Sequence, residues 1–207
     1  MSSKHLPSGK IDEIIEKFFS DPSIRVDQPN YFSNLYLLRK EANICMTVSP
    51  KTLWAGAMVV FAGIDLLGKL NRGTKETVTK RFTKFCEEFV VYDDKGLAAP
   101  LYKLRCAMMH SFSLYESDSK KRYLLTEGLG KEIVVADNNY IHFDVARIYA
   151  RFEGCIPKVK SWIELNKVTL KNDLMERFEE YGFTYVADQQ IFVPVSTATF
   201  TVSGGPV

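Results

Sequence analysis

The strongest regularity in this sequence is an apolar repeat that runs through residues 140–165. Its members recur at intervals of three and four residues, which is the spacing of one face of an α-helix. They are Ile141, Val145, Ile148, Phe152, Ile156, Val159 and Ile163. A helix of this kind must bury its apolar stripe against other elements, so the chain is expected to consist mainly of packed helices. Pro157 lies inside the repeat and predicts a kink or a break near Gly154, because proline removes a helical hydrogen bond.

Six further segments have helical patterns or helix boundary signals. They are residues 10–20, 30–45, 50–71, 75–91, 99–113 and 169–181. Ser49 followed by Pro50 is typical of an N-cap and a first helical residue, so the third of these helices is expected to begin at Pro50. Thr74 is expected to cap the helix that follows.

The strand signals are short and lie late in the chain. Residues 122–126 and 131–136 are β-rich and flank a glycine-containing turn, so a hairpin is predicted over about residues 122–136. Residues 183–202 predict one or two terminal strands, and residues 204–207 are expected to fray. The predicted fold class is mainly α, an up-and-down helical bundle with an inserted β-hairpin and a short β-rich C-terminal tail. One domain is expected over residues 1–183, with the tail at 184–207.

The most apolar segment, residues 52–68, is expected to be a buried core helix. It contains Asp65 and lies between Lys51 and Lys69, and it is shorter than the about 20 apolar residues that a membrane span needs. No apolar core of a secretory signal follows the N-terminus, so a cytoplasmic protein without membrane association is expected. The net charge of +2 restricts any nucleic-acid recognition to a local basic patch.

The cysteines and histidines do not form a metal-binding pattern. The four cysteines are widely spaced and contain no C-x-x-C pair, which is typical of reduced, buried thiols. They are Cys45, Cys86, Cys106 and Cys155. The three histidines, His5, His110 and His142, do not lie at metal-ligand spacing, and the chain has no glycine-rich phosphate loop. No metal and no cofactor are expected.

The segment LYKLRCAMMHSFSLY, residues 101–115, contains the main candidate for chemistry. It places Arg105 and His110 on a mostly apolar helix, where an arginine needs a partner or an opening to water. A histidine can serve as general acid or base near neutral pH, and an arginine is a permanent cation that suits phosphate. Together they predict phosphodiester cleavage without a metal, in which His110 moves a proton and Arg105 stabilises the transition state.

The helical spacing sets a condition on this pair. Five residues at about 100° each place Arg105 and His110 about 140° apart around an ideal helix. The two side chains therefore do not meet unaided. His110 must lie where the helix ends or bends, or a second subunit must complete the site.

The Arg-x4-His spacing near a helix end, preceded by Leu-Tyr-x-Leu, resembles the signature of the HEPN family (higher eukaryote and prokaryote nucleotide-binding domains). The segments FAGIDLLGKLNRG (residues 61–73) and KRFTKFCEEFV (residues 80–90) extend the resemblance to a little-characterised bacterial branch, over about residues 52–165. It implies an all-α, HEPN-like bundle that forms a homodimer with both motifs in one cleft. Active members are metal-independent RNA endonucleases, often paired with an antitoxin or working in phage defence. Arg105 and His110 match the motif arginine and histidine.

Two other functions stay open. The residue after the motif arginine is usually polar in active members, and here it is Cys106. This departure favours a non-catalytic HEPN-like module that binds a nucleotide, RNA or a protein partner, in which Arg105 and His110 are structural residues. The third alternative is an unrelated helical interaction protein, which would be a monomer with Arg105 and His110 on opposite faces.

Asp65 and the basic residues each have a functional and a structural interpretation. Asp65 either pairs with Arg105 as an orienting carboxylate or faces water, and the sequence slightly favours water. Basic residues gather near Gly73 and after the motif helix, where they either track an RNA backbone or form a solvated surface, and the near-neutral charge favours the surface. They are Lys69, Arg72, Lys75, Lys80, Arg81, Lys84, Lys120, Lys121 and Arg122.

Overall fold

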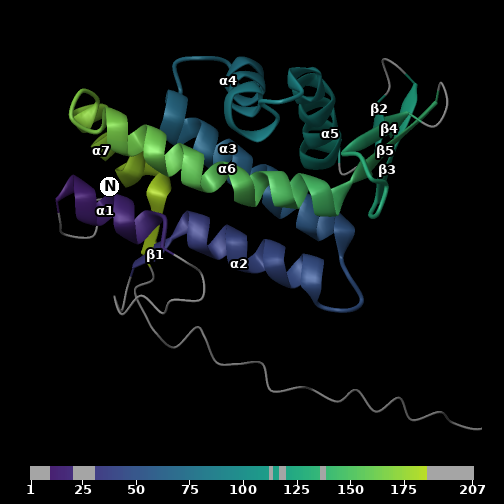
Figure 1. Cartoon of the computed structure of the whole chain (residues 1–207), viewed down its shortest axis with the longest axis horizontal. Helices are drawn as coiled ribbons and strands as arrows, with labels where there is room; N and C mark the ends of the chain where they lie inside the picture. The colour runs from purple at the N-terminus through teal and green to yellow at the C-terminus, as the bar shows by residue number, and fades with distance from the viewer. Residues whose placement is uncertain (1–9, 21–30, 112–113, 117–119, 136–138, 186–207) are drawn as a thin grey trace, which may run out of the picture.

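The computed structural model of the chain describes residues 10–20, 31–111, 114–116, 120–135 and 139–185. It is mainly helical, as the sequence predicts, and Figure 1 shows the helices packed side by side with a small sheet at one end. The helices are α1 (Ile11–Phe18), α2 (Asn34–Thr47), α3 (Leu53–Arg72), α4 (Val78–Phe85), α5 (Ala98–Ser111), α6 (Val145–Asn166) and α7 (Lys171–Arg177). Two π-helical turns, η1 (Cys86–Val90) and η3 (Phe178–Gly182), extend α4 and α7, and a 3₁₀ turn, η2 (Lys95–Leu97), precedes α5.

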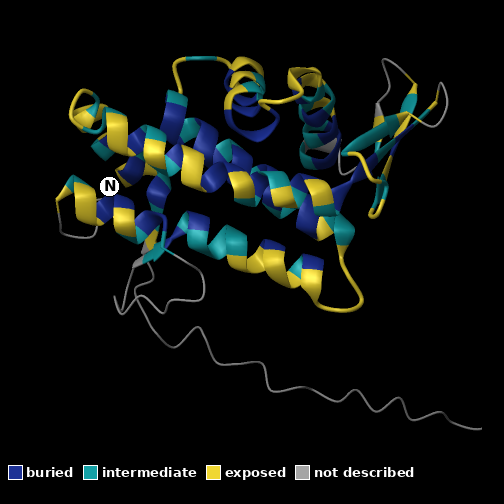
Figure 2. Ribbon diagram, in the orientation of Figure 1, coloured by how far each residue is buried: buried dark blue, intermediate teal, exposed yellow. Residues whose placement is uncertain are grey.

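Helix α3 is the centre of the bundle. It packs against α2, α4, α5 and α6, and Figure 1 shows α2 below it, α6 in front of it and α4 and α5 above it. Val60, Phe61, Ile64, Leu67 and Leu70 on α3 are fully buried, and Figure 2 shows this helix largely in the colour of buried residues. By length and composition α3 could span a membrane, but here its apolar side chains form the core of the bundle, as predicted for residues 52–68.

Side-chain caps fix the starts of α2 and α4. The Ser33 hydroxyl accepts a hydrogen bond from Tyr36 N at 3.2 Å, and the Thr77 hydroxyl accepts one from Lys80 N at 3.4 Å. The prediction that Thr74 caps α4 was therefore wrong by one turn. Helix α3 begins at Leu53 and not at Pro50, which lies in the segment that connects α2 to α3. Gly73 ends α3, with a positive φ of 68° that favours glycine.

The long helix was predicted to start five residues too early. Residues Tyr140–Asp144 form strand β5, and α6 begins at Val145. The Asp144 carboxylate caps α6 by accepting a hydrogen bond from Arg147 N at 3.0 Å. Ile141 and Phe143 are buried and alternate with the half-buried Tyr140 and His142 in β5, but Ile141 also fits the helical spacing of the residues that follow. Helix α6 runs without a break through Pro157 to Asn166.

The predicted hairpin was also wrong, because a third strand lies between its two arms. Strand β3 (Lys121–Thr126) pairs in parallel with β5, and β4 (Ile133–Val135) pairs antiparallel with the other edge of β5. Strand β2 (Tyr115–Glu116) completes a four-stranded sheet of order β2-β3-β5-β4. Phe143 of β5 lies opposite both Leu125 and Ile133, and it is fully buried against the helices.

A second, two-stranded sheet joins the two ends of the folded body. Strand β1 (Tyr31–Ser33) pairs antiparallel with β6 (Phe183–Tyr185). One of the predicted terminal strands is thus present, and it crosses the expected boundary between residues 183 and 184. The rest of the predicted tail, including residues 204–207, lies outside the described residues, as does His5.

The glycines of α3 provide a matched test of this packing. A Cβ atom at Gly63 would lie 2.5 Å from Cζ of the buried Phe152 on α6, whereas one at Gly68 would lie 3.6 Å from its nearest neighbour. We expect Gly63→Ala to destabilise the protein by about 2 kcal/mol through overpacking. Gly68→Ala should stabilise it by up to about 1 kcal/mol, because alanine has the higher helix propensity. Urea unfolding measures both, and equal effects of the two variants would contradict this packing of α3 against α6.

The thiols give a second prediction. All four cysteines are free; Cys86 and Cys155 are buried, whereas Cys45 and Cys106 are partly exposed. Burial raises the pKa of Cys86 well above its usual range and that of Cys155 to about 12. At pH 8 we expect iodoacetamide to label Cys45 and Cys106 in the folded protein and all four thiols after denaturation. Mass spectrometry of peptides reads out each site, and rapid labelling of Cys86 or Cys155 in the folded state would contradict the prediction.

Candidate functional site

The centre of the candidate site is an ion pair between two helices. The Asp65 Oδ2 atom on α3 accepts hydrogen bonds from Arg105 Nε at 2.9 Å and Arg105 Nη2 at 2.7 Å on α5. The side chains are 11% and 14% exposed for Arg105 and Asp65, so the pair lies at the edge of the core and not on the open surface. Of the two alternatives for Asp65, the structure therefore contains the pair with Arg105.

Two donors of one guanidinium on one carboxylate oxygen hold Arg105 in a fixed orientation. Burial of the guanidinium by itself lowers the pKa of Arg105, but the hydrogen bond with Asp65, the charge of Asp65 and the contact with Cys106 outweigh it and raise the pKa. Arg105 is therefore a permanent cation whose position is set by α3. Such a cation needs no rearrangement before it meets an anion.

The second oxygen of Asp65 is less well satisfied. Within the part of the chain that the structure describes, Oδ1 is buried and has no hydrogen-bond partner. The Asp65 carboxylate also lies close to the buried Cys86 thiol of η1. Burial is the main cause that raises the pKa of Cys86, and the nearby Cys155 and Asp65 raise it further. A buried acceptor without a donor lowers the stability of the folded protein. The hydrogen bonds from Arg105 to Oδ2 therefore account for the position of Asp65, and the surroundings of Oδ1 do not.

A polar row beside the ion pair includes two residues that the sequence analysis missed. The Thr79 hydroxyl on α4 donates to the Tyr102 hydroxyl at 2.7 Å, and the side chains of Tyr102 and Arg105 both lie within interaction range of Cys106. The i, i+4 spacing of Tyr102 and Cys106 was a visible signal that they share a face. Thr79 had none, because it lies in another helix.

His110 occupies the last turn of α5, one residue before the helix ends at Ser111. Its side chain lies outside the described part of the structure. The helix is continuous from Arg105 to His110, so the separation of about 140° around the axis holds for the two backbone positions. His110 therefore lies near a helix end, as the proposed chemistry requires. It follows Cys106 by four residues, so the two positions lie on the same face of α5.

The basic residues near Gly73 are mostly engaged locally. Arg72 pairs with Glu88, and Lys84 pairs with Glu76. The Lys69 Nζ atom lies 4.7 Å from the centre of the Tyr181 ring, and Arg81 is only 5% exposed. These contacts favour a solvated, internally paired surface over a continuous track for an RNA backbone. His142 lies half-buried in β5.

The residues that the structure describes contain no cluster of three or more histidine, cysteine, aspartate or glutamate side chains that could hold a metal ion. Comparison of the chain with protein-family models, with curated proteins and with solved structures found no match. The function must therefore be argued from the site itself.

Proposed function

We propose that the protein is a metal-independent RNA endonuclease of the HEPN type, with Arg105 and His110 as its catalytic residues. The observation that supports this most is the bond of Arg105 to Asp65, which presents a fixed cation on the helix that also holds His110. Asp65 acts as the positioning carboxylate. This assignment agrees with the resemblance of residues 101–115 to the HEPN motif and with the chemistry of the two residue types.

The proposed reaction uses the neighbouring 2′-hydroxyl of RNA as the nucleophile. The 2′-oxygen forms a new bond to phosphorus, and the bond between phosphorus and the 5′-oxygen of the next nucleotide breaks. A base accepts the 2′-proton and an acid donates a proton to the leaving oxygen, and both are tasks for histidine. Arg105 stabilises the negative charge on the phosphorus-bound oxygens. The products are a 2′,3′-cyclic phosphate and a 5′-hydroxyl.

A homodimer fits this chemistry better than a monomer. Within one chain, Arg105 and His110 are about 140° apart on α5, so one copy of the motif does not direct both groups at one phosphate. A second copy of α5 facing the first would supply the missing group from the other subunit. Two histidines in one cleft could also divide the roles of base and acid.

The test is RNA cleavage in excess EDTA. We expect purified protein at micromolar concentration to cut single-stranded RNA and to leave DNA of the same sequence intact, because DNA lacks the 2′-hydroxyl. Light scattering coupled to gel filtration should give the mass of a dimer. Intact RNA of several sequences at high enzyme concentration would contradict the proposal.

The second candidate function is a non-catalytic module of the same type, which binds RNA, a nucleotide or a protein. One observation favours it: Cys106, which lies near both Arg105 and Tyr102, occupies the position where active members usually have a polar residue. This function predicts RNA binding without cleavage. It also predicts that His110→Ala alters stability or dimerisation.

A further inference from the structure

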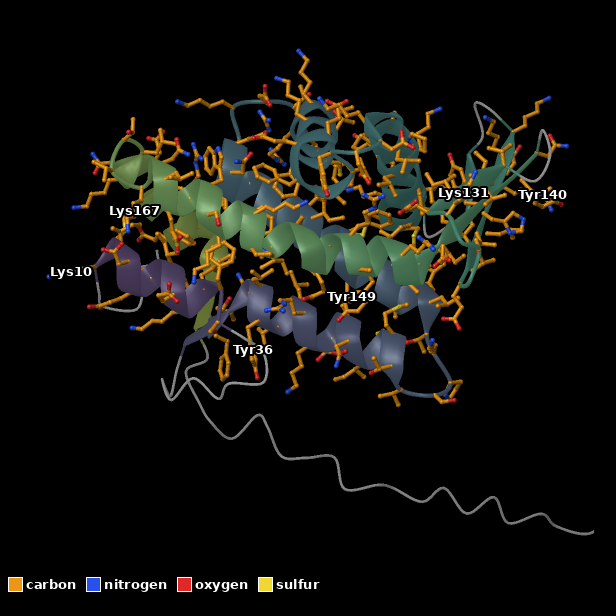
Figure 3. The ribbon with its side chains drawn as sticks, in the orientation of Figure 1. Lys10, Tyr36, Lys131, Tyr140, Tyr149 and Lys167 are labelled. Atoms are coloured by element: carbon orange, nitrogen blue, oxygen red, sulfur yellow. The ribbon has the colours of Figure 1, made fainter. Side chains whose placement is uncertain are left out.

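A hollow on the outer side of α6 is separate from the Arg105 site. It has a volume of about 360 Å³, which lies within the range of small-molecule pockets, about 300–1,000 Å³. One wall is formed by η1 and Tyr92, and the other by one strip of α6. Glu132 lines the hollow directly before the sheet strand β4, and its neighbour in the sequence, Lys131, is labelled in Figure 3.

The α6 wall combines small residues with long cations. Arg147, Arg151, Gly154 and Lys158 recur at intervals of four, three and four residues and so share one face of the helix. Gly154 forms an open part of the floor, since a Cβ atom there would have no neighbour within 4 Å. A glycine in a helix interior lowers stability relative to alanine, and one use of it is the close approach of a ligand to the backbone.

The charges of the hollow do not balance. Arg151 donates to Glu132 Oε1 at 2.9 Å and also pairs with Asp93. The Lys158 Nζ atom lies 3.4 Å from the centre of the Tyr92 ring, and its charge also reaches Asp93. Arg147 is exposed, and among the described residues its side chain has no hydrogen bond or ion pair. Asp93 lies beside the hollow and not in its lining; when it is counted with Glu132, the three cations meet two carboxylates, which leaves a net charge of one positive unit.

The opposite wall is mostly apolar. Phe89 and Val90 are almost fully buried but line the hollow, and Tyr92, which is 54% exposed, lines it as well. An apolar wall that faces a few fixed polar groups is the usual composition of a small-molecule site. The guanidinium of Arg147 can bind a carboxylate through two parallel hydrogen bonds.

We propose that this hollow binds a small aromatic carboxylate, with its ring between Gly154 and the Phe89–Val90 wall and its carboxylate on Arg147. The single negative charge of such a ligand matches the net charge of the hollow. The site is independent of the proposed ribonuclease activity, because it shares no residue with the Arg105 site.

The test compares three probes by calorimetry: 2-naphthoate, its neutral isostere 2-naphthamide, and acetate. We expect 2-naphthoate to bind at least tenfold more tightly than 2-naphthamide, and acetate to show no binding at millimolar concentration. Arg147→Gln should weaken the binding of 2-naphthoate at least fivefold and leave that of 2-naphthamide unchanged. Lys171→Gln, which removes the same charge from α7, should change neither.

Gly154→Leu provides the steric test, because its side chain would project into the hollow from a position where a Cβ atom has no neighbour within 4 Å. We expect it to abolish binding of both naphthalene probes while the melting temperature stays at or above that of the parent protein. Equal affinities of 2-naphthoate and 2-naphthamide for the parent protein would overturn the proposal. Full binding by a folded Gly154→Leu or Arg147→Gln variant would overturn it as well.

Discussion

Replacing His110 with alanine should lower the single-turnover rate of RNA cleavage by at least about 100-fold, because a positioned general acid or base contributes about 10²–10⁴-fold. Arg105→Ala should cause a loss of similar size, since a single fixed charge donor at a transition state is worth about 10²–10³-fold. The two losses should not add in the double variant, because the residues act on the same step.

The matched control for His110 is His142→Ala. His142 lies half-buried in β5 and not on the motif helix, so its removal should leave the cleavage rate within about twofold of the parent. Any stability cost should stay within the usual range of about 0.5–3 kcal/mol for a point mutation. Thermal unfolding of both variants separates loss of catalysis from loss of fold. Equal cleavage by the His110→Ala and parent proteins would eliminate the catalytic role.

Removing the Asp65 carboxylate should destabilise the protein by about 2 kcal/mol. Asp65→Ala leaves the Arg105 guanidinium, which is 11% exposed, without the acceptor of its Nε and Nη2 atoms. The double variant Asp65→Ala/Arg105→Met should recover about 1–2 kcal/mol of this loss, because methionine needs no carboxylate. Urea unfolding of the four proteins measures the coupling energy.

The control for this cycle is the pair of Lys51 and Glu127. Their atoms lie 2.9 Å apart, but both side chains are more than 40% exposed, so Glu127→Ala should cost at most about 1 kcal/mol. Additive effects of Asp65→Ala and Arg105→Met would show that the two residues are not coupled. Asp65 could not then be the positioning carboxylate.

The helical part of this fold could be predicted from the sequence, because apolar spacing on α1, α3 and α6 follows the helix period over whole turns. The sheet could not. The apolar spacing of α6 continues into strand β5, because Ile141 and Val145 fit the helix period as well as they fit the end of a strand. The sequence therefore predicted a helix over these residues. Its position between β3 and β4 depends on tertiary pairing, which placed two neighbouring β-rich segments on opposite edges of one strand.

The main residues of the candidate site could be predicted from the sequence, but their pairing could not. The motif singled out Arg105 and His110, and Asp65 was recognised as the carboxylate that could pair with Arg105. The choice between pairing and water depended on how α3 and α5 pack, across 40 residues of sequence. Thr79 had no signal at all, whereas the cationic strip of α6, from Arg147 to Lys158, was visible in the spacing and was overlooked beside the apolar repeat.

The most direct measurement of the central claim uses an oligonucleotide of DNA that contains a single ribonucleotide. Incubated with the protein in excess EDTA, it should be cut only after that ribonucleotide. Mass spectrometry should find a 2′,3′-cyclic phosphate on one fragment and a 5′-hydroxyl on the other, and His110→Ala should produce neither. Cleavage that requires a divalent metal, or that persists undiminished in the His110→Ala protein, would contradict the assignment of Arg105 and His110 as the catalytic pair.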